Sequence, residues 1–251
     1  MIFFRECTIV FNRQLRMNLR NPAWVIIGML QPILYLLLFG PLLKPLIGQF
    51  GAANAYTFFV PGMLVQLGVF GAFFAGFSLI GEWREGVIEA ERVTPASRTA
   101  LLVGRLMRDL LQLFVQALIL VGLGYAMGMS AGFGGVVTGI LLTLLIGGAC
   151  AASSNALALT TKSEDVMAPV INMVMMPVLL LSGILLPMTI GPHWLRRASD
   201  FMPIRWIVDA VRSAFSGSFA NSTMFWGVGW ALVLFVLALW WGTATFRREN
   251  S

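Results

Sequence analysis

Long apolar runs alternate with short clusters of charged residues along this chain. A helix needs about 20 apolar residues to cross a membrane, and six stretches of the sequence reach this length. The uncharged interval between Asp109 and Lys162 is counted as two of them, because a glycine-rich sequence at 128–135 divides it. The pattern predicts an all-α polytopic membrane protein with one transmembrane domain over residues 1–251. The expected spans are about 23–43, 57–80, 106–127, 136–160, 166–188 and 223–245.

The sequence has too few charged residues to cover the protein with a water-exposed surface. Charged residues make up 11% of it and apolar residues 58%, whereas a soluble domain is about 25% charged. The net charge of +6 comes from Lys and Arg near the ends of the apolar runs, where such residues anchor membrane helices. We therefore expect membrane lipid around this chain and no nucleic-acid partner.

The distribution of Lys and Arg between the connecting segments predicts the orientation in the membrane. When the spans are placed alternately, twelve of these residues fall on the side that holds both termini and five on the other side. Positive residues are enriched in cytoplasmic connections. Both termini of this multi-pass protein are therefore predicted to be cytoplasmic.

Two segments outside the spans are too apolar or too amphipathic to be simple loops. Residues 1–21 place most Arg side chains on one side of a helix and most large apolar side chains opposite. This is typical of an interfacial helix that lies in the membrane plane. Residues 189–212 combine aromatic residues with four arginines on the predicted outer side. We expect one or two short helices there, which lie at the outer surface or dip into it.

The residues needed for catalysis or for ATP binding are missing from the sequence. A P-loop requires a glycine-rich turn followed by Lys and Ser or Thr, and neither Lys44 nor Lys162, the only lysines, follows such a turn. No ionisable residue lies near the middle of a predicted span, and the single histidine, His193, lies outside the spans. Cys7 and Cys150 are interpreted as packing residues. We predict no catalytic residue, metal ligand or cofactor site on this chain.

The segment Glu82–Arg98 is the most informative charged stretch. Glu82, Glu85 and Glu89 are spaced i, i+3 and i+7, so they would share one face of a helix that Pro95 ends. Lys and Arg suffice to set the topology, so these acidic residues need another explanation. One interpretation is a solvated loop, and the other is a helix that docks to a cytoplasmic partner.

Small residues recur at every fourth position of the fourth predicted span. Such residues let helix backbones approach each other closely. The stripe is interpreted as packing within the chain, with a dimer seam or the wall of a transport pathway as alternatives. The residues concerned are Gly135, Gly139, Gly147 and Ala151, with Thr143 between them.

Six short motifs follow one another along nearly the whole chain. They read RNPAW at 20–24, QPILYLLLFG at 31–40, FFVPGML at 58–64, GEWREGVIEAERVTP at 81–95, PVLLLSGILLPM at 177–188 and DFMPIRWIVDAVR at 200–212. No single motif is specific, but their order and spacing together resemble the permease subunits of type-2 ABC exporters. The resemblance is closest to the daunorubicin-resistance-type multidrug efflux permeases.

This resemblance implies a half-transporter in the inner membrane of a prokaryote. Two permeases, identical or paralogous, would pair, and two separate ATP-binding subunits, which bind ATP and Mg, would dock beneath them. The segment Glu82–Thr94 would be the coupling helix, Thr161–Asp165 a second cytoplasmic contact, and 189–212 outer re-entrant helices. The docking residues implied are Glu82, Glu85, Gly86, Glu89, Arg92 and Thr94, with Lys162, Glu164 and Asp165 in the second contact.

The function expected from this resemblance is ATP-driven export of a hydrophobic or amphiphilic compound, drug-like or lipid-like, from the cytoplasm or the inner leaflet. The chain itself would be a transport subunit and not an enzyme. An exporter of a lipid-linked polysaccharide or teichoic-acid-type glycan on the same fold is one alternative. A non-transporting membrane scaffold is the other. A neighbouring gene for an ATP-binding subunit would favour either exporter over the scaffold.

Overall fold

The computed structural model describes residues 2–20, 23–43, 45, 54–88 and 98–248. These residues are mostly helical and include no strand, which confirms the predicted all-α class. The first half of the chain holds α1 Ile2–Arg20, α2 Ala23–Leu43, α3 Ala55–Gln66, the π-helical turn η2 Leu67–Gly71 and α4 Ala75–Arg84. The second half holds α6 Arg98–Ala126, α7 Phe133–Thr161, α8 Glu164–Leu181, the short η3 Met188–Ile190, α9 His193–Asp200, α10 Pro203–Phe215 and α11 Ser222–Arg248.

Five helical stretches of the described chain are long and apolar enough to cross a membrane. They are Ala55–Arg84, Thr99–Ala126, Phe133–Thr161, Glu164–Leu181 and Ser222–Phe246. The apolar part of α2, Gly28–Leu42, is shorter, so the count of six spans stays a prediction. The third predicted span, 106–127, corresponds to α6, which begins earlier, at Arg98.

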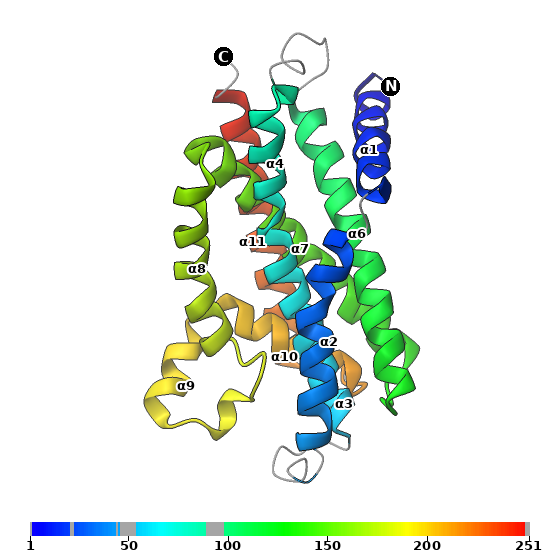
Figure 1. Cartoon of the computed structure of the whole chain (residues 1–251). Helices are drawn as coiled ribbons and strands as arrows, with labels where there is room; N and C mark the ends of the chain where they lie inside the picture. The colour runs from blue at the N-terminus through cyan, green and yellow to red at the C-terminus, as the bar shows by residue number, and fades with distance from the viewer. Residues whose placement is uncertain (1, 21–22, 44, 46–53, 89–97, 249–251) are drawn as a thin grey trace.

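The long helices run up and down between the two ends of a bundle. Figure 1 places the start of α1, the end of α4, the start of α6 and the end of α11 at one end, called here the termini end. There Arg84 Nη1 lies 3.1 Å from Glu164 Oε1, so α4 ends beside the start of α8. At the far end the Thr57 hydroxyl donates to the Ser130 carbonyl at 3.1 Å, so α3 starts beside the α6–α7 connection.

One span changes its helix type in the middle. Elements α3, η2 and α4 form one continuous stretch, and the π turn with the following turn at Phe74 disturbs the regular helical hydrogen bonds. Ser154 on α7 supplies a replacement: its hydroxyl donates to the Phe73 carbonyl and accepts the Gly76 N–H at 3.1 Å. A neighbouring hydroxyl of this kind lets a membrane helix tolerate such a break.

The small-residue stripe of α7 faces other helices of the same chain. A Cβ at Gly135 would lie 2.2 Å from the Ala214 carbonyl oxygen, and one at Gly139 would lie 2.5 Å from the Phe215 ring, both on α10. A Cβ at Gly147 would lie 2.2 Å from a Leu113 methyl carbon on α6. Ala151 is also buried. The contacts of the three glycines and the burial of Ala151 therefore support the interpretation as packing within the chain.

The predicted outer segment contains α9 and α10, both at the far end (Figure 1). α10 lies against α3, α7 and α11, and a Cβ at Gly227 on α11 would lie 2.3 Å from Ala210 Cβ. Since Gly135 and Gly227 belong to the first two turns of their helices, α10 sits inside the end of the bundle and not beyond it. That this segment, 189–212, re-enters the membrane stays a prediction.

Arg212 on α10 ties three elements of the far end together. Its Nη2 donates to the carbonyls of Gly183 and Ile184, at 2.8 and 3.1 Å, just after α8 ends. Its guanidinium also lies 4.2 Å from the centre of the Phe58 ring and donates to the Phe58 carbonyl at 3.4 Å. Three of the six sequence motifs therefore meet at one side chain.

α1 packs beside the first half of α6 (Figure 1). A Cβ at Gly104 of α6 would lie 2.8 Å from Val10 Cβ, so the two backbones approach closely. Arg5, Arg13 and Arg16 are exposed, as the predicted polar face requires, but Gln14 is fully buried. α1 thus runs along α6, whereas the sequence pattern predicted an interfacial helix in the membrane plane.

Two glycines of α11 provide a matched test of this packing. Gly227→Ala should lower the unfolding free energy by about 1–3 kcal/mol, the usual cost of overpacking, because the new methyl group would also meet the Trp206 carbonyl oxygen at 2.6 Å. Gly229→Ala should be neutral or stabilising by up to about 1 kcal/mol, since nothing lies within 4 Å of its Cβ position. Thermal unfolding in detergent measures both, and equal midpoints for the two variants would contradict the placement of α10.

Candidate functional site

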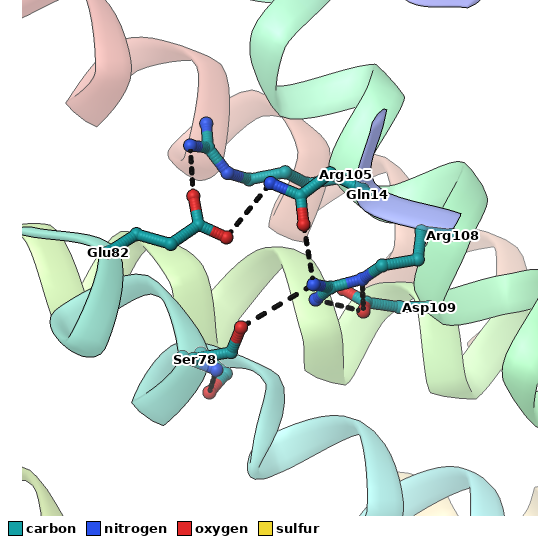
Figure 2. A network of polar contacts seen from close by, with 8 residues as sticks. Gln14, Ser78, Glu82, Arg105, Arg108 and Asp109 are labelled. Carbon is teal, nitrogen blue, oxygen red and sulfur yellow. Dashed lines mark hydrogen bonds and ion pairs between the residues drawn. The ribbon is translucent and has the colours of Figure 1, made fainter. Parts of the chain in front are cut away.

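A buried network of polar side chains joins α1, α4 and α6 near the termini end (Figure 2). The Glu82 carboxylate accepts a hydrogen bond from Arg105 Nη2 at 2.7 Å and another from Gln14 Nε2 at 2.9 Å. The amide oxygen of Gln14 accepts in turn from Arg108 Nη1 at 2.9 Å. Each of the three helices therefore contributes at least one side chain to a continuous chain of hydrogen bonds.

The network balances its charges internally. Arg108 Nη2 lies 2.6 Å from Asp109 Oδ1, and its Nη1 reaches the Ser78 hydroxyl at 3.4 Å. The side chains of Arg105 and Glu82 are only 3% and 6% exposed. A buried charge is costly unless it is paired and hydrogen-bonded, and two arginines face two carboxylates here. These contacts hold α4 firmly against α1 and α6.

Helical spacing explains how the side chains converge. Ser78 and Glu82 are four residues apart on α4, and Arg105, Arg108 and Asp109 are spaced i, i+3 and i+4 on α6, so each set lies on one face of its helix. The sequence patterns did not predict this network. The charged residues at the start of α6 are a signal that could have found part of it, but Gln14 carries no such signal.

The structure places the predicted docking residues of the coupling segment in different environments. Glu82 does not face a partner as predicted, because Arg105 and Gln14 hold its carboxylate inside the protein. Glu85 is exposed just beyond the end of α4. Gly86 adopts a left-handed φ of 73°, which suits a residue that ends a helix. Glu89, Arg92 and Thr94 lie outside the described residues.

The second predicted contact lies beside the end of α4. Lys162 ends α7 with a left-handed φ of 51°, and its ammonium group lies 4.7 Å from the centre of the Trp83 ring. Glu164 pairs with Arg84, and Asp165 is exposed. Two segments far apart in the sequence therefore form one surface, which we call the charged rim. It consists of Arg84, Glu85, Lys162, Glu164 and Asp165.

The charged rim is better suited to reversible binding of a protein than to catalysis or metal binding. The Arg84 and Glu164 side chains are 58% and 41% exposed, and exposed ion pairs contribute only about 0–1 kcal/mol. A partner could therefore exchange such a pair for its own charges at little cost. In the part of the chain that the structure describes, no three His, Cys, Asp or Glu side chains gather as a metal site would require.

Comparisons with known proteins agree on one family. The ABC-2 type transporter family model matches residues 5–216 of this chain. The daunorubicin resistance ABC transporter permease protein DrrB1 of Streptomyces coeruleorubidus is 30% identical over 225 residues, which cover 86% of this chain and 75% of that protein. The putative transport permease ycf38 of Cyanophora paradoxa is 26% identical over 222 residues, with 86% and 76% covered. The ycf38 protein of Pyropia yezoensis is 25% identical over 228 residues, with 89% and 75% covered.

The contribution of the buried Glu82–Arg105 pair to stability can be measured by comparing a variant of Glu82 with the same change at the exposed Glu85. Glu82→Gln should lower the unfolding free energy by about 3–5 kcal/mol, because it leaves the Arg105 charge buried opposite a neutral group. Glu85→Gln removes the same charge three residues later on the surface, so it should stay within about 0.5 kcal/mol of the parent. Thermal unfolding in detergent compares the two variants.

A double-mutant cycle separates the pair from general damage at position 82. Combining Glu82→Gln with Arg105→Gln should recover part of the lost stability, since the second change removes the buried charge. Strictly additive losses, or a Glu82→Gln variant as stable as the parent, would show that the pair does not hold α4.

Proposed function

The chain belongs to the ABC-2 type transporter family, and we propose from this membership that it exports an amphiphilic compound with energy from a separate ATP-binding subunit. As a permease subunit it forms the membrane part of a transporter. In our proposal residues 1–251 act as one transmembrane domain with six spans, in the inner membrane of a prokaryote. Both termini face the cytoplasm.

Export of a drug-like or lipid-like compound is supported by the likeness to the daunorubicin resistance permease. Resistance to a drug follows directly when the drug is moved out of the cell. The proposed transport starts in the cytoplasm or the inner leaflet. Two copies of the chain, or this chain and a paralogue, would enclose the pathway between them.

The charged rim is the proposed docking site of the ATP-binding subunit. It is exposed, and it combines the end of α4 with the α7–α8 turn, two segments that a docked protein could contact together. The partner would bind ATP and Mg and hydrolyse the nucleotide, so this chain would need no cofactor. The undescribed residues Glu89, Arg92 and Thr94 would extend the same docking segment.

The observation that carries this proposal is the connection between the charged rim and the buried network. α4 has ten residues, and the rim residue Arg84 is only two positions beyond Glu82. A partner that displaces the end of α4 therefore acts on the helix that Glu82 fixes to α6 and α1. In this proposal the exposed residues of the charged rim receive the displacement, and the buried Glu82 transmits it to α6 and α1.

Charge reversal on the charged rim should test the docking site. The double variant Glu85→Arg, Asp165→Arg should reduce copurification of the coexpressed ATP-binding subunit by about tenfold or more, because like charges across an interface cost several kcal/mol. Its thermal stability should stay unchanged, since both side chains are exposed. Arg197→Glu, an exposed reversal on α9 at the other end, is the control and should bind normally.

Transport itself is measured with the complex in inverted membrane vesicles. We expect ATP-dependent accumulation of daunorubicin, used as a fluorescent amphiphilic probe, and loss of this accumulation in the rim variant. If the rim variant copurified with the ATP-binding subunit and transported normally, the docking site would have to lie outside the charged rim. Failure of every amphiphilic probe with an intact complex would reject the proposed substrate class but not the docking site.

A further inference from the structure

Asn172 lies at the middle of α8 with its side chain exposed. α8 is long and apolar enough to cross a membrane, and Asn172 is the ninth of its 18 residues. Each end of the helix is therefore about 13 Å away, which is further than an asparagine side chain reaches. Within the described chain the Asn172 amide has no hydrogen-bond partner. An amide at this depth needs a partner from outside the chain, because lipid tails offer none.

Other amides on the membrane helices are turned inward. Gln66 on α3, Gln116 on α6 and Asn155 on α7 are at most 3% exposed. α8 stands at one side of the bundle, where it packs on α7 and α9 (Figure 1). Polar side chains at membrane depth usually face other helices or a water-filled path. The outward position of Asn172 therefore indicates that something other than lipid covers its side of α8.

The exposed face of α8 has two different borders. The buried stripe that faces the bundle consists of Met167, Ile171, Met175 and Val178. At about 3.6 residues per turn, Asn172 and Met176 lie along one border of this stripe. Val170 and Val174 lie along the other border. Valine is favourable against lipid and an amide is not, so the two borders face different surroundings.

We propose that the border with Asn172 and Met176 contacts the transported compound in the pathway between two permease copies. This inference rests on the proposed export function and names residues that recognise the compound. The amide donates and accepts hydrogen bonds without carrying a charge, and α8 has no charged residue after Asp165. The flexible side chains of Met173 and Met176, 81% and 62% exposed, adapt to apolar molecules of different shapes. The compound is therefore mainly apolar and presents an uncharged carbonyl, hydroxyl or amide group to Asn172.

A transported compound fits this border better than a tightly packed second helix does. Helices that approach closely in a membrane have small residues at the contact, as the stripe of α7 has. The neighbours of Asn172 along its border are Pro169 and Met176, about one turn away on either side, and both would keep a facing backbone at a distance. Asp165 of the charged rim lies two turns earlier on the same side of α8. The border therefore begins at the end where the ATP-binding subunit would dock.

Single cysteines test what the two borders face. Asn172→Cys and Val170→Cys are each made in the full chain with Cys7→Ala and Cys150→Ala, and are coexpressed with the ATP-binding subunit. A charged methanethiosulfonate reagent reacts with thiolates, which apolar surroundings suppress. During ATP hydrolysis Asn172→Cys should react about tenfold faster than Val170→Cys or more, and daunorubicin should slow its reaction. Equally slow modification of both variants would place Asn172 against lipid and overturn the proposal.

The hydrogen bond itself is tested with Asn172→Leu. ATP-dependent accumulation of daunorubicin in inverted vesicles should fall about three- to tenfold, which corresponds to one lost hydrogen bond. Asn172→Gln should retain part of the transport. Val170→Leu is the matched change at the other border and should transport like the parent. All three variants should copurify with the ATP-binding subunit, because the charged rim is unchanged.

Two further outcomes would contradict the contact with the compound. Unchanged transport by Asn172→Leu would remove the proposed hydrogen bond. If Asn172→Leu eluted as a monomer in detergent while the parent eluted as a dimer, the border would be a seam between copies. Both outcomes leave the proposed export function intact. The labelling comparison needs no substrate, so a parent complex that transports no amphiphile would reject the export function without removing a measured difference between the two borders.

Discussion

A buried charge is costly unless it is paired and hydrogen-bonded, and Arg105 finds its partner on a different helix. The Glu82–Arg105 pair is almost fully inaccessible, so neither side chain can turn to water if the other moves away. Removing one member of such a pair typically costs about 3–5 kcal/mol. The position of α4 relative to α6 is therefore fixed by electrostatics, whereas its packing is mainly against α7. Gln14 extends the same constraint to α1, so side-chain hydrogen bonds join all three helices.

Arg212 applies the same principle at the far end with backbone carbonyls as acceptors. Burial lowers the pKa of its guanidinium to about 10, which leaves it charged at neutral pH. The charge is met by Asp209, whose carboxylate lies 3.7 Å from Nη1, and by the carbonyls of Gly183 and Ile184 in the connection that follows α8. Each end of the bundle thus has a buried arginine that joins elements distant in the sequence.

Sequence patterns predicted the helical class and the approximate places of the long apolar helices, because apolar length depends only on local composition. They did not predict which face of a charged helix turns inward. Glu82 and Glu85 belong to the same i, i+3 pattern, yet Glu82 meets Arg105 whereas Glu85 meets solvent. That difference depends on contacts with α6, which is distant in the sequence and therefore does not enter the pattern of residues around Glu82. The glycine stripe likewise predicted close packing at Gly135 and Gly139, but its partner, α10, became known only from the fold.

The contrast between exposed and buried ion pairs determines how a force at the charged rim can spread. The Arg84–Glu164 pair is exposed and worth at most about 1 kcal/mol, so a docking protein can replace it with its own contacts. Breaking the Glu82–Arg105 pair half a turn away would cost several times more. A displacement at the rim is therefore more readily met by movement of α4 together with α6 and α1 than by separation of α4 from them. In our proposal the weak contacts thus lie where the ATP-binding subunit would dock, and the strong ones lie where α4 is held to α6 and α1.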